Sequence, residues 1–387
     1  MVNVSTAGVN KTVYHQPVWI FGPALGILSN ILTCRLSRFR NCTGSAPVSA
    51  AAQPQSSREE EKEERNVKRK REDAECHPDK KEDERGEVKT VCKEGLPVLK
   101  GYVAARRGER EEMQDAHVLL PDMSSCLSAL PEQVSRVSYF AVFDGHGGAR
   151  ASRFAAEHLH HNLAKKFPSG DTENVDKLIK KCLLDTFRQT DEDFLKKASS
   201  QKPAWKDGST AACVLVVDDM VYVANLGDSR VVLCRMETAA DGQRRSVTLA
   251  LGKEHNPTVY EERMRIQRAG GTVRDGRVLG VLEVSRSIGD GQYKRCGVIS
   301  TPDLRRCQLT ANDRFIILAC DGLFKVFSAD EAVKFVLKIL QEGSVEQRLG
   351  LTEEEVRFET ACQQLAGEAV KRGCADNVTV ILVSIGF

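Results

Sequence analysis

From residue 96 to the C-terminus, short uninterrupted apolar runs alternate with segments of helical periodicity. Residues 137–143, 314–320 and 378–385 are apolar runs of the length and composition typical of buried strands. Residues 211–217 and 221–224 flank Asp218-Asp219, which predicts an antiparallel hairpin. Two further strands are expected at residues 231–234 and 247–251.

Helical patterns separate these strands. Residues 175–194 carry apolar side chains three or four positions apart, the pattern of an amphipathic helix. Pro257 is expected to begin a helix that ends at Gly270-Gly271. Ser328 and Glu331 form a capping-box pattern before a helix predicted for residues 332–340, and a last helix is predicted for 353–372. Because hairpins lie among separate helices, without regular strand–helix alternation, the pattern predicts an α+β fold with antiparallel sheets.

The first 95 residues have a different composition. No Asp or Glu precedes Glu59, and residues 58–89 are mostly charged. Such a stretch cannot bury enough apolar surface to offset its ordering entropy. We therefore predict a disordered tail over residues 1–95 and a folded domain over residues 96–387.

Two alternatives stay open within this tail. The lack of acids and the scattered Arg of the first 58 residues are also features of a targeting signal. Lys68-Arg69-Lys70-Arg71 is either a nuclear-localisation cluster or a solvated charge run. We expect a cytoplasmic protein with a nuclear fraction.

Charge and cysteine content exclude several classes of protein. The chain has 56 Lys and Arg against 54 Asp and Glu, so its net charge of +2 gives no general attraction to nucleic acid or to an anionic membrane. Its 13 Cys include no CxxC pair, which argues against a disulfide framework or a zinc ribbon and favours a reducing compartment. No apolar run is long enough for a membrane-spanning helix. We expect a monomer.

Four aspartates stand at the ends of apolar runs. Asp144, Asp228 and Asp321 follow such runs, and Asp376 precedes one. A single Asp in this position is usually a turn former. Four carboxylates that converge would repel one another unless cations neutralise them. Oxygen ligands without His or Cys favour Mg²⁺ or Mn²⁺ over Zn²⁺.

Seven short segments carry a family resemblance. They are REEMQDAH from Arg110, DGHGG from Asp144, GST from Gly208, GDSR from Gly227, SRSIGD from Ser285, CDG from Cys320 and DN from Asp376. In this order, from near Gly101 to the C-terminus, they resemble the metal-dependent type 2C protein serine/threonine phosphatases. Each segment alone is a weak signal, whereas the ordered set is specific.

The resemblance implies a sandwich of two antiparallel β-sheets flanked by α-helices, with two ions, Mg²⁺ or Mn²⁺, at one edge. It implies that a hydroxide bridging the ions hydrolyses phosphoserine and phosphothreonine. The implied ligands are Asp144 for both ions, the Gly145 carbonyl for one, Asp321 and Asp376 for the other, and Asp115, with Gln114, for metal-bound waters.

Two further residues receive implied roles in catalysis. Arg110 would hold the substrate phosphate, for which the planar guanidinium is suited. His146 would protonate the leaving alkoxide, whose pKa lies far above 7. Without the resemblance, Arg110 would be a surface Arg of a charged stretch, and His146 could simply pack the turn that contains it.

The sequence departs from the family pattern at two positions. Many members have Glu where Gln114 stands, and many have Asp where Lys325 stands. Because that Asp helps to bind a third, weaker metal, a third site near Lys325 is in doubt. The Lys325 ammonium could pair with Asp321 and repel a divalent ion, or its stem could lie along Phe324 and Phe327 with the head in solvent.

Two other classes of protein are disfavoured by the sequence. A catalytically dead scaffold would require loss of a core aspartate, and all are present. A nucleic-acid-binding protein is disfavoured by the charge balance. The resemblance implies phosphoprotein substrates, and a narrower likeness within the family implies integrin-linked kinase as a partner.

Overall fold

The computed structural model describes residues 95–170, 173–342 and 348–387. All of them belong to the second of two compact units of the chain, residues 86–387. The predicted tail and the basic cluster at residues 68–71 lie outside the described residues. The domain boundary at residue 95 therefore stays a prediction.

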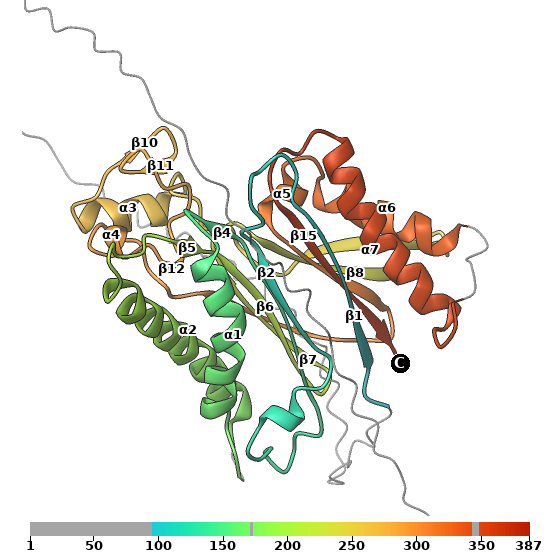
Figure 1. Ribbon diagram of the computed structural model, residues 1–387. Helices are drawn as coiled ribbons and strands as arrows, with labels where there is room; N and C mark the ends of the chain where they lie inside the picture. Colours follow the sequence, from blue (N-terminus) through green and yellow to red (C-terminus); the bar gives the residue numbers. More distant parts are fainter. Residues whose placement is uncertain (1–94, 171–172, 343–347) are drawn as a thin grey trace, which may run out of the picture. The chain divides into compact units, whose positions relative to one another are not determined.

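Two five-stranded antiparallel sheets form the centre of this unit (Figure 1). One sheet has, in spatial order, β1 (Val98–Arg106), β15 (Val378–Gly386), β14 (Asp313–Ala319), β8 (Arg230–Thr238) and β9 (Arg244–Ala250). The other has β13 (Asp303–Gln308), β7 (Met220–Leu226), β6 (Ala211–Val217), β3 (Val137–Phe143) and β2 (Ala116–Leu120). The predicted α+β sandwich is confirmed.

Helices cover the outer face of each sheet (Figure 1). α1 (Arg150–Lys166) and α2 (Val175–Ser199) pack on the β3 sheet, and α6 (Ala329–Gln341) and α7 (Glu353–Lys371) pack on the β15 sheet. Alternate residues of β3 therefore enter two cores, since Phe140 packs between the sheets and Tyr139 packs under the helices. Burial of both faces explains the uninterrupted apolar runs of the sequence.

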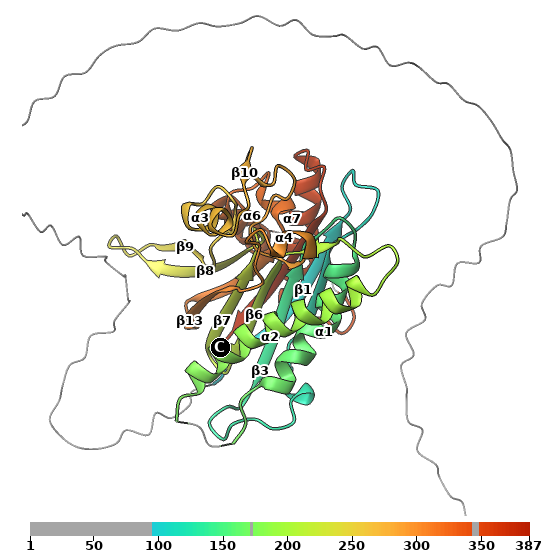
Figure 2. The ribbon, with the colours of Figure 1, turned by 90° about the vertical axis from the view of Figure 1, so that its left-hand side faces the viewer.

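Small elements gather at one end of the sandwich (Figures 1 and 2). They are β4 (Gly145–His146), β5 (Gly208–Ser209), β12 (Ile288–Gly289), α3 (Tyr260–Arg268), β10 (Val273–Arg274), β11 (Arg277–Val278) and α4 (Gly291–Lys294). The single-turn helix α5 (Asp321–Phe324) directly follows β14, and the 3-10 turn η1 (Ser124–Cys126) follows β2.

Most predicted elements are present, but one boundary was wrong. β6 and β7 form the expected hairpin, with Asp218 in a left-handed conformation at φ 55°. Pro257 does not begin a helix, because the Asn256 side chain accepts a hydrogen bond from the Thr258 amide and holds a turn there. The helix α3 begins at Tyr260.

The helix α1 and the strands β1, β2 and β13 were not predicted, and neither were the short elements of one turn or two residues. None of the helices in the described residues is both long and apolar enough to cross a membrane.

Candidate active site

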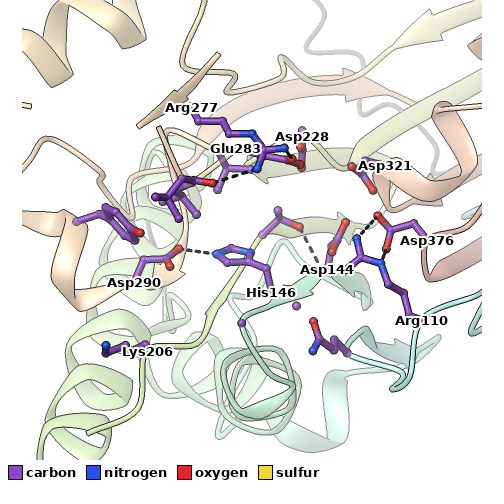
Figure 3. Close-up of a pocket in the computed structure, with 18 of the residues that line it drawn as sticks. Arg110, Asp144, His146, Lys206, Asp228, Arg277, Glu283, Asp290, Asp321 and Asp376 are labelled. Carbon is purple, nitrogen blue, oxygen red and sulfur yellow. Dashed lines mark hydrogen bonds and ion pairs between the residues drawn. The ribbon is translucent and has the colours of Figure 1, made fainter. Parts of the chain in front are cut away.

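The strand-end aspartates converge on one pocket (Figure 3). Carboxylate oxygens of Asp144, Asp228 and Asp321 lie within 4.8 Å of one another, and Asp376 lines the same pocket of about 370 Å³. An oxygen of Asp115 lies within the same distance of Asp144. The structure therefore brings the four strand-end aspartates and Asp115 to one place.

Strand pairing sets the position of these carboxylates. Asp144 follows the last residue of β3, and its carbonyl accepts a hydrogen bond of 2.9 Å from the Thr210 amide at the start of the neighbouring β6. Asp321 follows β14, and Asp376 precedes the adjacent antiparallel strand β15. In antiparallel neighbours the end of one strand lies beside the start of the next, so these side chains share one edge.

Three glycines shape the turn after Asp144: Gly145 through a close approach, and Gly147 and Gly148 through a positive φ. A Cβ on Gly145 would lie 2.2 Å from the Gln114 carbonyl oxygen. Gly147 and Gly148 have φ of 67° and 132°. The turn after Asp144 therefore depends on glycine for space at one position and for conformation at two.

Burial opposes the ionisation of three of these carboxylates, those of Asp144, Asp115 and Asp228. Burial, reinforced by the neighbouring carboxylates, raises the pKa of Asp144 well above its usual range. The same causes raise the pKa of Asp115 to about 6 and that of Asp228 to about 7. A group of carboxylates that resists ionisation alone is stabilised in its charged form by bound cations.

The donor atoms suit hard divalent ions. Asp115 Oδ1 is buried without a hydrogen-bond partner among the described residues, as expected of an oxygen that faces an ion or its water. Cys320, for which the sequence suggested no ligand role, has its Sγ within 4.8 Å of Asp115 and Asp144 oxygens. However, Cys320 Sγ accepts from the Thr379 amide and donates to the Asn377 carbonyl, and burial raises the pKa of this thiol. The neutral thiol leaves oxygen as the ligand type.

Lys325 reaches into the carboxylate cluster. Its Nζ lies 2.7 Å from Asp321 Oδ2 and 2.6 Å from Asp376 Oδ2. This arrangement corresponds to the first of the two alternatives, in which the ammonium pairs with Asp321. A partner role for Asp376 was not foreseen, because only tertiary structure brings residues 51 positions apart together.

Arg110 lies at the mouth of the pocket and contacts Asp376 with both prongs of its guanidinium. Nε is 3.0 Å from Asp376 Oδ1, and Nη2 donates to Oδ2 at 3.0 Å. The register of β1 and β15, which pairs Arg106 with Val378, places the Arg110 loop beside Asp376. Burial would raise the pKa of Asp376, but hydrogen bonds from Lys325 and the charge of Arg110 lower it.

His146 lies between Asp144 and Asp290 (Figure 3). Its Nε2 is 2.6 Å from Asp290 Oδ2. Desolvation lowers the pKa of His146, but the carboxylates around it, Asp290 foremost, outweigh desolvation and raise it. Asp290 stands in the SRSIGD segment, yet a lone Asp before a Gly is indistinguishable from a turn former in the sequence.

Two other polar residues have structural places at the site. Asn377 accepts from the Gln114 amide and donates to the carbonyls of Arg107 and Glu112, so it orders the Arg110 loop. Asp207 does not join the carboxylate cluster, because Arg150 Nε donates a hydrogen bond to its carboxylate at 2.9 Å.

The two-sheet sandwich thus carries, at one end of its strands, a carboxylate-lined pocket with the oxygen donors that a divalent metal ion requires. Residues 100–378 match the family model described as protein phosphatase 2C. The chain therefore belongs to the protein phosphatase 2C family, and it is a metal-dependent protein serine/threonine phosphatase.

Relatives of known sequence support this assignment, and a solved structure supports the fold. The chain is 64% identical over 300 residues to the integrin-linked kinase-associated serine/threonine phosphatase 2C of Homo sapiens, covering 77% of this chain and 76% of that protein. It is 39% identical over 294 residues to the probable protein phosphatase 2C 8 of Arabidopsis thaliana, covering 74% and 78%. The crystal structure of serine-threonine phosphatase 2C from Toxoplasma gondii shares the fold, with a TM-score of 0.60, 23% identity and coverage of 76% and 96%.

Proposed function

We propose that this phosphatase uses two Mg²⁺ or Mn²⁺ ions to hydrolyse phosphoserine and phosphothreonine in proteins. Asp144 would contact both ions, the Gly145 carbonyl one of them, and Asp321 and Asp376 the other. Asp115 would bind ion-bound water through its unpartnered Oδ1. The observation that carries the proposal is the convergence of carboxylates whose ionisation burial opposes.

When bound, the ions supply a water nucleophile of lowered pKa and neutralise charge on the phosphoryl oxygens. The other roles belong to side chains of this chain. Arg110 would turn its two-pronged guanidinium from Asp376 to the substrate phosphate. His146 would donate a proton to the seryl or threonyl oxygen as the ester bond breaks.

Metal removal and carboxamide variants test the proposal. Hydrolysis of a phosphoserine peptide should stop after exhaustive EDTA treatment and return with Mn²⁺ or Mg²⁺. Asp144→Asn, Asp321→Asn and Asp376→Asn should each lower kcat by at least about 100-fold, Asp144→Asn most, because removing a carboxylate weakens ion binding. Calorimetric Mn²⁺ titration should show the same order of lost binding.

Asp219→Asn is the matched control, since Asp219 lies in the turn between β6 and β7, where its carboxylate accepts from Gln308. It should leave activity and Mn²⁺ binding unchanged. Full activity after EDTA treatment, or equal Mn²⁺ binding by Asp144→Asn and wild type, would contradict the proposal.

Integrin-linked kinase is the proposed partner of this phosphatase. The likeness to integrin-linked kinase-associated phosphatases supports a place in integrin-linked kinase signalling. Immobilised Asp144→Asn protein should retain purified integrin-linked kinase, and absence of retention would count against this partner.

The protein is proposed to act in the cytoplasm and, through Lys68–Arg71, in the nucleus. Replacing these four residues with Ala should move a tagged chain toward the cytoplasm without changing its specific activity. An unchanged distribution would show that the cluster is a solvated charge run.

A further inference from the structure

The imidazole of His146 is held on one side by a buried carboxylate. Its Nε2 lies 2.6 Å from Asp290 Oδ2, and Ser287 Oγ donates to the same oxygen at 2.7 Å. Asp290 is only 2% exposed. Because an ionised carboxylate only accepts hydrogen bonds, Nε2 must carry its hydrogen in this contact. Nδ1 has no protein partner among the described residues, and the ring lines the pocket (Figure 3).

The backbone around Asp290 is built to maintain this contact. Asp290 has a left-handed conformation at φ 52°, and its amide donates to the Asp207 carbonyl at 3.0 Å. The preceding Gly289 amide donates to the buried Asp191 carboxylate at 2.8 Å. Two independent hydrogen bonds thus fix the turn that carries Asp290.

Gly208 makes room for the same contact. A Cβ on Gly208 would lie 2.2 Å from Asp290 Oδ2 and 2.2 Å from His146 Nε2. Any other residue at this position would push the imidazole and the carboxylate apart. β4 pairs with β5 so that His146 lies opposite Gly208. The space left by the missing side chain of Gly208 therefore lies beside the imidazole.

We propose that Asp290 is a positioning residue that keeps Nε2–H of His146 turned toward its carboxylate, so that Nδ1 is the atom that faces the ester oxygen. The inference rests on the proposed function, in which His146 protonates the leaving group. As water attacks phosphorus and the P–O ester bond breaks, the proton on Nδ1 passes to the seryl oxygen. The products are serine, inorganic phosphate and a neutral imidazole that still donates from Nε2 to Asp290. A carboxylate that fixes the orientation of a catalytic imidazole is a known arrangement in other hydrolases.

Dependence on the leaving group separates this role from a structural one. A seryl alkoxide needs protonation, whereas the p-nitrophenolate of p-nitrophenyl phosphate is a weak base and leaves without it. Asp290→Asn suits the left-handed backbone, for which Asn is tolerated. With Mn²⁺ present, this variant should lower kcat for a phosphoserine peptide by about 10- to 100-fold and kcat for p-nitrophenyl phosphate by less than about threefold. KM for the peptide should stay near that of wild type.

Asp191→Asn is the matched control, because Asp191 holds the same turn from the other side without touching His146. Asp191→Asn should change kcat for the phosphoserine peptide and kcat for p-nitrophenyl phosphate by the same factor. Ser287→Ala, which removes only the second hydrogen bond to Asp290, should shift the ratio of the two rates in the same direction as Asp290→Asn. It provides the test if Asp290→Asn does not fold.

A double-mutant comparison completes the experiment. If Asp290 acts through His146, Asp290→Asn should have no further effect on peptide hydrolysis in a His146→Ala background. A further loss there, or an equal loss on both substrates in the single variant, would overturn the inference. If His146→Ala itself left the substrate ratio unchanged, the proposed acid role of His146 would fail and the inference with it. If only Asp290→Asn left the ratio unchanged, the inference alone would fail.

Discussion

Lys325 occupies a position at which a cation is expected. Its ammonium contacts one oxygen each of Asp321 and Asp376, both proposed ion ligands. A tethered monocation there competes with an incoming divalent ion and also replaces the carboxylate that relatives use for a third metal. Lys325→Ala should therefore raise Mn²⁺ affinity by about 10-fold, equal to one unfavourable interaction of about 1.4 kcal/mol removed. Calorimetry and anomalous diffraction measure this without relying on activity.

Two further variants sharpen this prediction. Lys325→Asp should add a third, weaker Mn²⁺ position beside Asp321. Lys206→Ala is the control, because Lys206 lines the same pocket without an ion pair among the described residues. Three fully occupied ions in the wild type at low millimolar Mn²⁺, or unchanged affinity in Lys325→Ala, would refute the competition.

Arg110 is predicted to act mainly on phosphate binding. Its guanidinium already presents two donors to a pair of oxygens, those of Asp376, at 3.0 Å each. A substrate phosphate presents a similar pair, so Arg110→Ala should raise both KM and the inhibition constant of inorganic phosphate by about 10-fold, the factor for 1.4 kcal/mol. Arg107→Ala is the neighbouring control, since Arg107 is exposed and its side chain hydrogen-bonds only to the Glu111 carbonyl among the described residues. Unchanged constants in Arg110→Ala would exclude the phosphate role.

The carboxylates of the site could be predicted from the sequence, but the contacts between its charged side chains could not. Asp144, Asp321 and Asp376 could be predicted as site residues because each stands beside a long apolar run. The pairing of Lys325 with Asp376 could not be predicted from the sequence, because it depends on how two loops approach each other. Asp290 was missed for the opposite reason, since a carboxylate that serves one imidazole has the same local sequence as a turn.

At the scale of elements, burial on both faces made the central strands predictable. Every residue of β3 and β6 is buried, so apolar residues fill both strands without alternation. β1 and β13 have mixed burial, and their patterns do not stand out from loops. The N-cap residue of α1, Ala149, provides no side-chain cap, and the Arg150 amide donates instead to the distant Asp207, whereas the capping box of Ser328 and Glu331 predicted for α6 is present. Helices and strands with a local signal in the sequence could be predicted. The remaining elements depend on tertiary contacts, which the sequence does not show.

A buried charge network fastens α3 to the segment that leads to Asp290. Glu262 of α3, only 3% exposed, accepts hydrogen bonds from Arg286, Arg265 and Ser285. Burial would raise the pKa of Glu262, but these donors outweigh it and lower the pKa to about 2. Removing one member of a buried pair leaves the other charge uncompensated, so Glu262→Gln should destabilise the protein by about 3 kcal/mol at pH 7.

The pH dependence of this loss follows from the sign of the shift. A lowered folded-state pKa stabilises the fold above the usual value of 4.5, and this contribution is lost as pH falls from there toward about 2. The difference in Tm between wild type and Glu262→Gln should thus be largest near pH 7 and shrink below pH 4.5. Glu261→Gln, at the exposed neighbouring position, should show no such difference. A pH-independent difference in Tm would mean that packing, not charge, holds α3.

At the scale of the whole molecule, the sandwich connects distant parts of the chain to one site. The ligands proposed here come from residues 115 to 376, and antiparallel pairing between non-consecutive strands brings them to one edge. The layered architecture was predictable from the ordered motifs and the apolar runs. The sheet order was not, because many strand orders satisfy the same pattern of apolar residues.

The first strand of the described unit sets where the chain can be shortened. β1 pairs with β15 along its whole length, from Val98 with Gly386 to Arg106 with Val378, and its Leu99 and Ala104 are buried. A chain that starts at Cys92 keeps this strand and should retain kcat within about twofold, since the composition of residues 1–91 disfavours packing and no site motif lies there.

A chain that starts at Arg107 still contains every proposed site residue but lacks β1. Loss of β1 exposes the edge of β15. It also uncovers the two hydrophobic cores to which β1 contributes side chains, one on each face of the sheet. The support that holds Arg110 beside Asp376 is also lost. We therefore expect this shorter chain to be unfolded or to melt well below the longer one in a thermal scan. An inactive but folded chain from Cys92 would show that residues 1–91 take part in catalysis, whereas a stable, active chain from Arg107 would show that the β1–β15 pairing does not maintain the site.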